Sequence, residues 1–397
     1  MPDVQIRYDP FDASIIDDPY PTYRLLRDEE PVYHAAESDT WVLSRHDDVE
    51  TALLDHDNYS SVDGVFPRPP GSDFIESFLP MMVLIDPPRH NQLRALVSRA
   101  FTPRRIADLN DSIEHLAEDL VGRLDGGVGS ADFVADFAGV LPSMVIADLL
   151  GVPREDRDQF RQWSRMLVQA DPTHGQTADA LSAMAKMYNY FTDFLADRRR
   201  SPRNDLMSAL VSAEIDGVRL TDEELLGFCA LLLLAGTETT TNLLGNAAVV
   251  LAQHPDSRRR LAADLALLGP AIEELLRYDS PVQGLCRTLA HDVTLHNTTM
   301  SRGQSVLLLF GSANRDERVF ADPDVFDIDR KPEHQVAFGK GVHFCLGAAL
   351  ARMEARISLT ALLQRLPNWD VDLQSAQRLR SGPIRGYLSL PISCPPA

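Results

Sequence analysis

The hydrophobic and polar positions of this chain repeat mostly with the period of a helix. Apolar residues recur every three to four positions over several segments, as in helices that bury one face. Strand-like apolar runs are few and short, with TWVLS near the start and SVLLLF late in the chain. The pattern therefore predicts a mainly α-helical protein with a small β-rich lobe. Helices other than the longest are expected at 44–55, 89–100, 103–124 and 181–199.

The longest helical pattern runs from Thr221 to Gln253. Thr221 and Glu224 have the spacing of a capping box, which marks the start of a helix. At about 1.5 Å per residue, such a helix would be roughly 50 Å long. It is apolar nearly all round, so we expect a buried central helix. Its apolar run, 225–235, is much shorter than the roughly 20 residues of a membrane span.

A polar stretch, GTETTTN, interrupts this apolar helix from Gly236 onwards. Burying the carboxyl of Glu238 costs several kcal/mol unless partners or water compensate. Threonine hydroxyls can also bond back to carbonyls one turn earlier, which bends helices. The stretch is compatible with a structural polar pocket and with a functional site.

Composition and charge narrow the class of protein. The 397 residues carry a net charge of −20, with 24% charged and 44% hydrophobic residues, which is normal for a soluble globular protein and argues against non-specific nucleic-acid binding. The four cysteines, Cys229, Cys286, Cys345 and Cys394, form no CxxC pair and suit a reducing compartment. The polar, acidic N-terminal segment lacks the apolar core of a signal peptide or anchor. These features predict a cytoplasmic protein.

One cysteine lies in an unusual setting, the segment FGKGVHFCLG at 338–347. A lone buried cysteine usually acts as a small apolar filler. Here, however, Gly341 and Gly347 allow tight turns or the close approach of a flat ligand. A helix is expected to begin near Leu346, directly after Cys345, and a helix N-terminus stabilises a thiolate. Such a thiolate is a good axial ligand for haem iron.

Three motifs in order resemble the cytochrome P-450 monooxygenases, bacterial and actinobacterial in type. Phe338-x-x-Gly341-x-x-x-Cys345-x-Gly347 is similar to the family's haem-binding loop, 235–240 (AGTETT) to its oxygen-activating helix segment, and 274–277 (ELLR) to its E-x-x-R pair. The resemblance covers essentially the whole chain. It implies a cytochrome P-450 fold with haem b (iron protoporphyrin IX) between the long central helix and the cysteine-loop helix. It also implies one haem domain over 1–397, without a fused reductase.

The resemblance assigns roles to individual residues. Cys345 would ligate the iron, with Phe338 packed beside its sulfur. Glu238 and Thr239 would be the catalytic acid–alcohol pair that delivers protons. Glu274, Arg277 and Arg330 would form a structural charge cluster. The remaining residues implied to contact the haem, several of them propionate partners, are His90, Arg94, Ala235, Gly236, Arg287, Gly339, His343 and Gly347.

The resemblance further implies where a substrate would lie. The contributing segments are the loop 61–82, the 231–238 turn of the long helix, 282–285 and 384–388. Most candidate side chains are apolar, as a pocket for a hydrophobic substrate requires. They are Phe66, Phe78, Met81, Met82, Val83, Leu231, Leu234, Val282, Leu285 and Tyr387. The expected reaction inserts one atom of O2, by hydroxylation or epoxidation, into a lipid-, terpenoid- or polyketide-like molecule.

The expected electron donor is a separate ferredoxin served by an NAD(P)H-dependent reductase. Local positive charge on an otherwise acidic protein would steer an acidic partner to the cysteine side of the haem. The candidate docking cations are Arg99, Arg104, Arg105, Lys340 and Arg352.

Three other functions compete with this interpretation. A peroxygenase driven by hydrogen peroxide would lack the acid–alcohol pair, so Glu238 and Thr239 argue against it. The same pair argues against a non-catalytic haem carrier, sensor or scaffold. A non-haem enzyme with Cys345 as nucleophile would need a general base nearby, and His343 is the nearest candidate along the chain.

Overall fold

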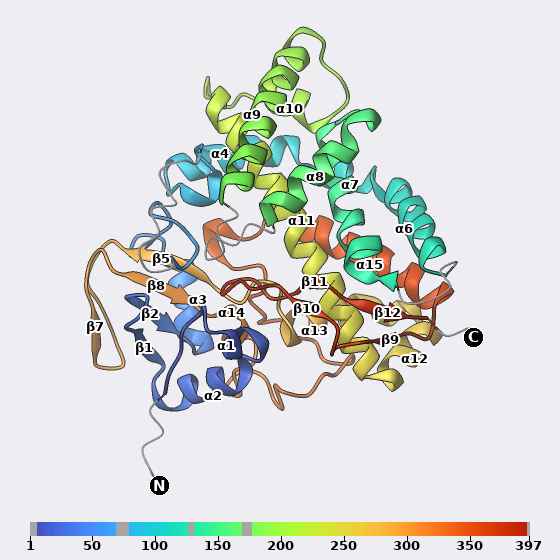
Figure 1. Ribbon diagram of the computed structural model, residues 1–397. Helices are drawn as coiled ribbons and strands as arrows, with labels where there is room; N and C mark the ends of the chain where they lie inside the picture. The colour runs from blue at the N-terminus through green and yellow to red at the C-terminus, as the bar shows by residue number, and fades with distance from the viewer. Residues whose placement is uncertain (1–5, 69–78, 126–130, 169–176, 395–397) are drawn as a thin grey trace. The chain divides into compact units, whose positions relative to one another are not determined.

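The computed structural model describes residues 6–68, 79–125, 131–168 and 177–394. By their contacts, the residues divide into two compact units, each built from several stretches of the chain. Unit 1 comprises residues 1–76, 269–345 and 378–386, and unit 2 comprises 77–268, 346–377 and 387–397. Helices and strands carry the same labels as in Figure 1.

Unit 1 is built around a five-stranded sheet with strand order β1-β2-β8-β5-β3. β2 and β8 run parallel, with Leu43 opposite Leu308, and the other neighbours are antiparallel. A two-stranded β6–β7 hairpin completes its strands. The strand bounds are β1 Val32–Ala35, β2 Thr40–Leu43, β3 Tyr59–Ser60, β5 Leu285–Leu289, β6 Val293–Leu295, β7 Thr298–Met300 and β8 Ser305–Leu308. The two runs predicted as strands, TWVLS and SVLLLF, are β2 and β8.

Both faces of this sheet are covered by apolar clusters. Successive side chains of a strand point to opposite faces, so one strand contributes to both clusters. In β8, Val306 and Leu308 join one apolar cluster, whereas Leu307 joins the other. The helices of unit 1 are α1 Ala13–Asp17, α2 Tyr20–Glu29, α3 His46–Leu54, α13 Leu268–Tyr278 (whose first residue belongs to unit 2), α14 Phe310–Ala313 and the 3-10 turn η6 Gly341–His343.

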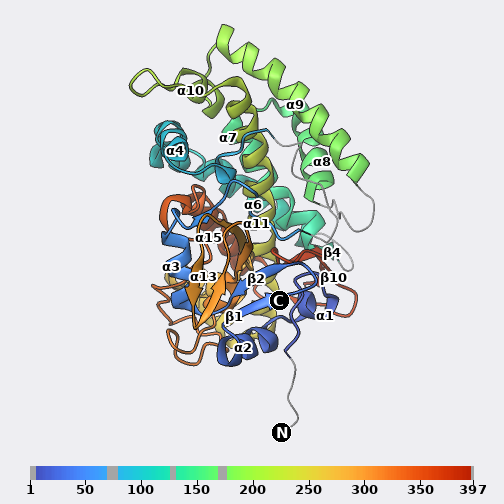
Figure 2. The same cartoon turned by 90° about the vertical axis from the view of Figure 1, so that its left-hand side faces the viewer.

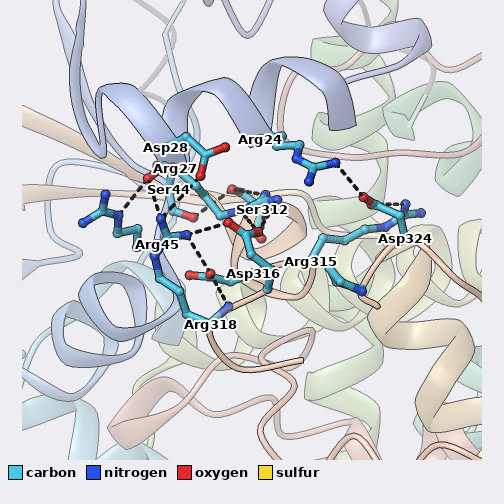
Figure 3. Close-up of polar contacts among 12 residues, drawn as sticks. Arg24, Arg27, Asp28, Ser44, Arg45, Ser312, Arg315, Asp316, Arg318 and Asp324 are labelled. Carbon is cyan, nitrogen blue, oxygen red and sulfur yellow. Dashed lines mark hydrogen bonds and ion pairs between the residues drawn. The ribbon is translucent and has the colours of Figure 1, made fainter. Parts of the chain in front are cut away.

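A buried arginine ties three of these elements together (Figure 3). Arg27 of α2 is 2% exposed and donates to the carbonyl and hydroxyl of Ser312 in α14, at 3.3 and 3.2 Å. It also pairs with Glu317 at 3.2 Å. The Ser312 hydroxyl in turn donates to the carbonyl of Ser44, two residues before α3. A guanidinium can be buried here because its N–H groups meet acceptors.

Unit 2 is helical and packs around α11 (Asp222–Gln253), the long helix that runs through Figures 1 and 2. Its N-cap is Thr221, and the capping box with Glu224 is present in both directions, at 3.2 and 2.8 Å. The predicted start and end of this helix are therefore confirmed. α7 (Val140–Leu150) and α15 (Ala348–Arg365) pack closely against α11. α8 (Arg157–Val168) and α9 (Thr177–Arg200) pack against each other and on α11.

Unit 2 also contains shorter helices, 3-10 and π-helical turns and short strands. The predicted helix at 89–100 is confirmed, whereas the single helix predicted at 103–124 is wrong: the chain breaks it at Asp108 and forms α5 and α6. The bounds are η1 Met82–Leu84, α4 Arg89–Ala100, α5 Pro103–Ala107, α6 Asn110–Asp125, β4 Ala131–Asp132, the π-helix η2 Val134–Ala138, α7 Val140–Leu150, η3 Arg154–Asp156, α8 Arg157–Val168, α9 Thr177–Arg200, α10 Leu206–Ser212, α12 Pro255–Ala263, η5 Leu265–Leu267, α15 Ala348–Arg365, β9 Asp370–Val371, β10 Gln377–Arg378, β11 Tyr387–Ser389 and β12 Pro391–Ser393. Arg378, the second residue of β10, belongs to unit 1.

A charge cluster lies in the interior of unit 1. Glu274 is fully buried and accepts hydrogen bonds from Arg277 at 2.7 and 2.8 Å and from Arg330 at 3.1 Å. Arg277 also donates to the carbonyls of Asn314 and Pro323. The carboxylate thus pairs with two cations that hold the chain between 314 and 330 against α13.

We expect Glu274→Gln to lower the free energy of unfolding by about 3 to 5 kcal/mol, because it leaves buried arginines without their counter-charge. Asp324→Asn is the matched control: Asp324 pairs with Arg315 at 3.0 Å, but its side chain is 50% exposed. Exposed pairs contribute about 0 to 1 kcal/mol. Urea unfolding followed by circular dichroism measures both changes. Equal losses in the two variants would contradict a special role for Glu274.

Candidate functional site

The segment 338–345 of unit 1 forms a tight turn that presents Cys345. The N–H of Cys345 donates to the carbonyl of Phe338 at 3.0 Å, which closes the turn on itself. Gly339 and Gly341 have φ angles of +66° and +67°, in the left-handed region that glycine adopts most easily. Cys345 is partly exposed and forms no disulfide with any cysteine of the described chain.

This turn, which we call the cysteine loop, is seated directly on the C-terminal end of α3. A Cβ added to Gly341 would lie 2.6 Å from the carbonyl oxygen of Leu53, closer than real Cβ atoms come. Only a glycine lets the two backbones approach in this way. Cys345 is followed by α15, which begins at Ala348, two residues later than the predicted Leu346, with Gly347 as its N-cap.

Two side-chain contacts fix the cysteine loop to the rest of unit 1. The Lys340 ammonium pairs with Glu50 of α3, and its hydrogen bond lowers the pKa of that carboxyl. The ring of His343 lies 3.3 Å, Nε2 to Oγ, from the hydroxyl of Ser61. The chain sequence gives no local signal for either pair, since 290 and 282 positions separate the partners. They are site contacts that sequence reasoning missed.

Arg287 is a buried cation of the same unit. It lies in β5, is 4% exposed, and donates from Nη1 to the carbonyl of its neighbour Cys286 at 2.7 Å. Phe338, the first residue of the cysteine loop, is partly buried, and its ring centroid lies 6.4 Å from that of Phe344. Unit 1 thus places a thiol, an aromatic ring and a buried guanidinium on defined elements.

In unit 2, α11 is buried on both sides of a partly exposed stretch. Residues 227–230 and 242–250 are buried, whereas Ala235 is exposed and Glu238 and Thr239 are partly exposed. The helix is continuous through this stretch. The Thr239 hydroxyl donates to the carbonyl of Ala235 at 2.8 Å, the back-bonding expected of a helical threonine.

Glu238 has an altered acidity. Although the residue keeps some exposed surface, its surroundings take the carboxyl out of water, and this burial raises the pKa of Glu238 to about 7. Gly236 has a packing explanation of its own, because an added Cβ would lie 2.6 Å from the Ile146 side chain of α7. Its lack of a side chain lets α7 and α11 pack closely.

His90 and Arg94 lie one turn apart on α4, in unit 2. His90 is 1% exposed and Arg94 is partly buried. The adjacent Arg89 pairs with Glu224 at 2.6 Å and so fixes α4 to the start of α11. The two predicted propionate partners therefore share one face of a helix that is anchored to α11.

The predicted substrate residues divide between the units and differ in exposure. In unit 1, Phe66 is 53% exposed, and Val282 and Leu285 are partly buried. In unit 2, Met81, Met82 and Tyr387 are buried, at 5%, 8% and 4% exposure. The partly buried members of unit 2 are Val83, Leu231 and Leu234. Phe78 lies outside the described residues.

Each unit by itself offers groups that suit a haem. In unit 1, Cys345 offers the sulfur that iron binds, and the buried Arg287, with His343, offers hydrogen-bond donors that suit propionate carboxylates. In unit 2, His90 and Arg94 offer donors of the same kind, and the exposed Ala235 offers an apolar surface for a flat ring. Among the described residues, no helix is both long and apolar enough to cross a lipid bilayer.

Comparison with known proteins agrees with this geometry. The family model described as Cytochrome P450 matches residues 31–383. A curated relative, the putative cytochrome P450 123 of Mycobacterium tuberculosis, is 45% identical over 396 residues, 98% of each chain. The vitamin D(3) 25-hydroxylase of Pseudonocardia autotrophica is 39% identical, covering 98% of this chain and 97% of its own.

A solved structure agrees as well. The crystal structure of CYP109E1 from Bacillus megaterium in complex with testosterone matches with a TM-score of 0.86 and 37% identity, over 96% of this chain and all of that one. The predicted mainly helical P-450 fold, haem b cofactor and monooxygenase class are therefore confirmed. The chain belongs to the cytochrome P450 family, the haem b monooxygenases.

Proposed function

We propose that Cys345 is the thiolate ligand of the haem iron and that the protein hydroxylates a steroid-sized hydrophobic molecule with electrons from a ferredoxin. The observation that carries the proposal is the cysteine loop, which holds a partly exposed thiol on a backbone fixed by Gly341 and by the Cys345-to-Phe338 hydrogen bond. Haem b, when bound, activates O2 so that one oxygen atom is inserted into the substrate.

Cations of the chain would hold the two propionates. Arg287 is the strongest candidate, because it is a buried cation of the unit that holds the cysteine loop and its planar fork matches a carboxylate. His90 and Arg94 share a helical face, and His343 lies within the cysteine loop. Ala235 and Gly236 would lie against the ring, with Gly339 and Gly347 on the cysteine side.

Glu238 and Thr239 would handle protons. A carboxyl with a pKa of about 7 can both hold and release a proton at neutral pH, which an ordinary glutamate cannot do well. The Thr239 hydroxyl donates to Ala235 and keeps its lone pairs available to accept. This pair favours oxygen activation over a peroxygenase or a non-catalytic haem protein.

The substrate would be an apolar molecule of steroid or polyketide size. Met81, Met82, Leu231, Leu234 and Val282 are flexible or branched apolar side chains, the type that lines such pockets. One relative is named for vitamin D(3), and one structural neighbour was solved with testosterone. Those names are the reason to begin with steroids and secosteroids.

The electron donor would be an acidic ferredoxin that docks by charge. Arg104 is exposed on unit 2, while Lys340 pairs with Glu50 and Arg99 donates to the carbonyl of Glu214. Arg104 is therefore the candidate tested first, because its side chain is exposed to a partner. Docking through it would weaken as salt rises.

Steroid binding should be visible in the ferric protein. We expect at least one of testosterone, corticosterone and vitamin D(3) to shift the Soret band from its low-spin to its high-spin position, with saturation. A substrate held by the apolar pocket would exclude water from the haem side of the pocket. The same titration with a charged molecule of similar size is the control. No shift with any apolar steroid would remove the steroid class from the proposal and leave the haem assignment untouched.

The cysteine loop should depend on Gly341 more than on Gly339. Alanine in the left-handed region costs about 1 to 2 kcal/mol at either position. Only at 341 would the new Cβ also meet a backbone carbonyl, whereas nothing lies within 4 Å at 339. We expect Gly341→Ala to retain less haem, measured as the ratio of Soret to protein absorbance, than Gly339→Ala. Equal haem contents would contradict the seating of the loop on α3.

Proton delivery should depend on Glu238 and Thr239. We expect Glu238→Gln and Thr239→Ala to reduce product formed per electron pair consumed, with turnover falling by about 10²-fold or more. Thr241→Ala is the matched control, since Thr241 makes the same back bond, to Thr237 at 2.9 Å, two positions along the helix. Comparable losses in all three variants would point to helix damage instead.

Glu238 should also make the free energy of unfolding depend on pH. Its folded pKa of about 7 exceeds the ordinary value of 4.5, so the folded chain holds a proton that the unfolded chain releases. The free energy of unfolding should therefore fall as the pH rises from the ordinary pKa of 4.5 to the folded pKa of about 7. Glu238→Gln cannot ionise and should lose this part of the pH dependence, measured by urea unfolding at several pH values.

A further inference from the structure

A second site lies at the start of α3, in unit 1, away from the cysteine itself. His46, the first residue of the helix, is 2% exposed. Its backbone N–H donates to Asp316 Oδ2 at 2.9 Å, and its ring Nε2 lies 2.8 Å from the carbonyl oxygen of His334. A carbonyl only accepts, so Nε2 carries the hydrogen. In the neutral ring, Nδ1 then carries the lone pair.

The Nδ1 atom of His46 is buried and has no hydrogen-bond partner. It points at two carboxylates, with Asp47 Oδ1 at 3.6 Å and Glu50 Oε2 at 3.8 Å. His46 and Glu50 lie one helical turn apart and so share a face. The three atoms lie within 4.8 Å of one another. A buried acceptor that faces two further acceptors is costly unless a proton or a metal cation lies among them.

The two oxygens of Glu50 have different neighbours. The Lys340 ammonium occupies Oε1, which leaves Oε2 toward His46. The neighbouring Asp48 is turned away, because it pairs with His296 at 2.8 Å. Asp47 is 93% exposed and approaches from the solvent side. Lys340 is an opposing charge, but Asp47 and Glu50 outnumber it.

From this arrangement we infer a divalent-cation site formed by His46 Nδ1, Asp47 and Glu50, suited to Zn²⁺. One imidazole nitrogen and two carboxylate oxygens are ligands that Zn²⁺ takes, with water in the fourth position. Tetrahedral ligands at about 2.0 Å from zinc lie about 3.3 Å apart, so small side-chain movements suffice. The His334 carbonyl and Lys340 would orient two of the ligands, as outer-shell partners do.

The inference is independent of the proposed function, because none of its ligands is proposed to contact haem or substrate. It does place a cation beside Glu50, whose other oxygen holds Lys340 of the cysteine loop. Metal at this site would therefore stiffen the seat of that loop.

The test is calorimetric titration of the EDTA-treated holoprotein with ZnCl₂. Asp47→Asn is the principal variant, because an exposed side chain can change without loss of the fold. Asp48→Asn is the matched control: it makes the same charge change one position further along the helix. Loss of an outer-shell partner weakens metal binding by about 10- to 100-fold, and loss of a direct ligand should weaken it at least as much.

We expect one Zn²⁺ per chain, bound much more weakly by Asp47→Asn and nearly unchanged in Asp48→Asn. Anomalous diffraction from zinc-soaked crystals should place the ion beside His46 Nδ1. Equal weakening in the two variants would overturn the site in favour of general charge attraction. No binding by the wild-type protein would mean that His46 and its carboxylates form an ordinary acid–imidazole contact.

Discussion

The contact between Gly341 and the carbonyl of Leu53 is the constraint on which the site depends. The two backbones are so close that no side chain fits between them. α3 therefore fixes how closely the cysteine loop approaches it. The hydrogen bond from the Cys345 N–H to the Phe338 carbonyl closes the loop on itself. The glycines are required by backbone geometry, and the cysteine gains its position from them. On a more mobile turn, the Cys345 sulfur would occupy the position needed for ligation a smaller fraction of the time.

α3 itself is held by polar groups that lie far away in the sequence. Asp316 accepts a hydrogen bond from the backbone N–H of His46, and the Ser312 hydroxyl donates to the carbonyl of Ser44, two residues before the helix. Arg27 joins this network from α2 (Figure 3). In unit 1, buried polar groups thus hold α3 in place, and α3 in turn holds the cysteine loop. In unit 2, the packing of α7 on Gly236 of α11 similarly fixes the helix that carries Glu238.

The parts of this structure that sequence predicted are those with local signals. The capping box located the start of α11 to the residue, and the amphipathic pattern located both ends of α4. The 103–124 segment was predicted as one helix because its apolar period continues across the break. The Asp108 N–H bonds back to the last turn of α5, and α6 starts again at Asn110. Hydrophobic periodicity alone does not predict a break of this kind between two helices.

The Glu274–Arg277 pair was predictable because both residues lie within one short segment. The roles of Cys345 and Glu238, which rest on motif spacing, stay predictions, and the contacts that support these segments had no local signal. The contacts of Lys340 with Glu50 and of His343 with Ser61 join segments nearly 300 positions apart, which no local pattern encodes. Side-chain burial was equally hidden: Phe66 is exposed, whereas Tyr387 is buried.

The most direct test of the central claim is the carbon-monoxide difference spectrum of the dithionite-reduced protein, recorded beside a Cys345→Ser variant. A thiolate ligand predicts a strongly red-shifted Soret band in the wild-type protein and its loss in the variant. The same band in both proteins, or no haem absorbance in the wild-type protein, would contradict Cys345 as the iron ligand.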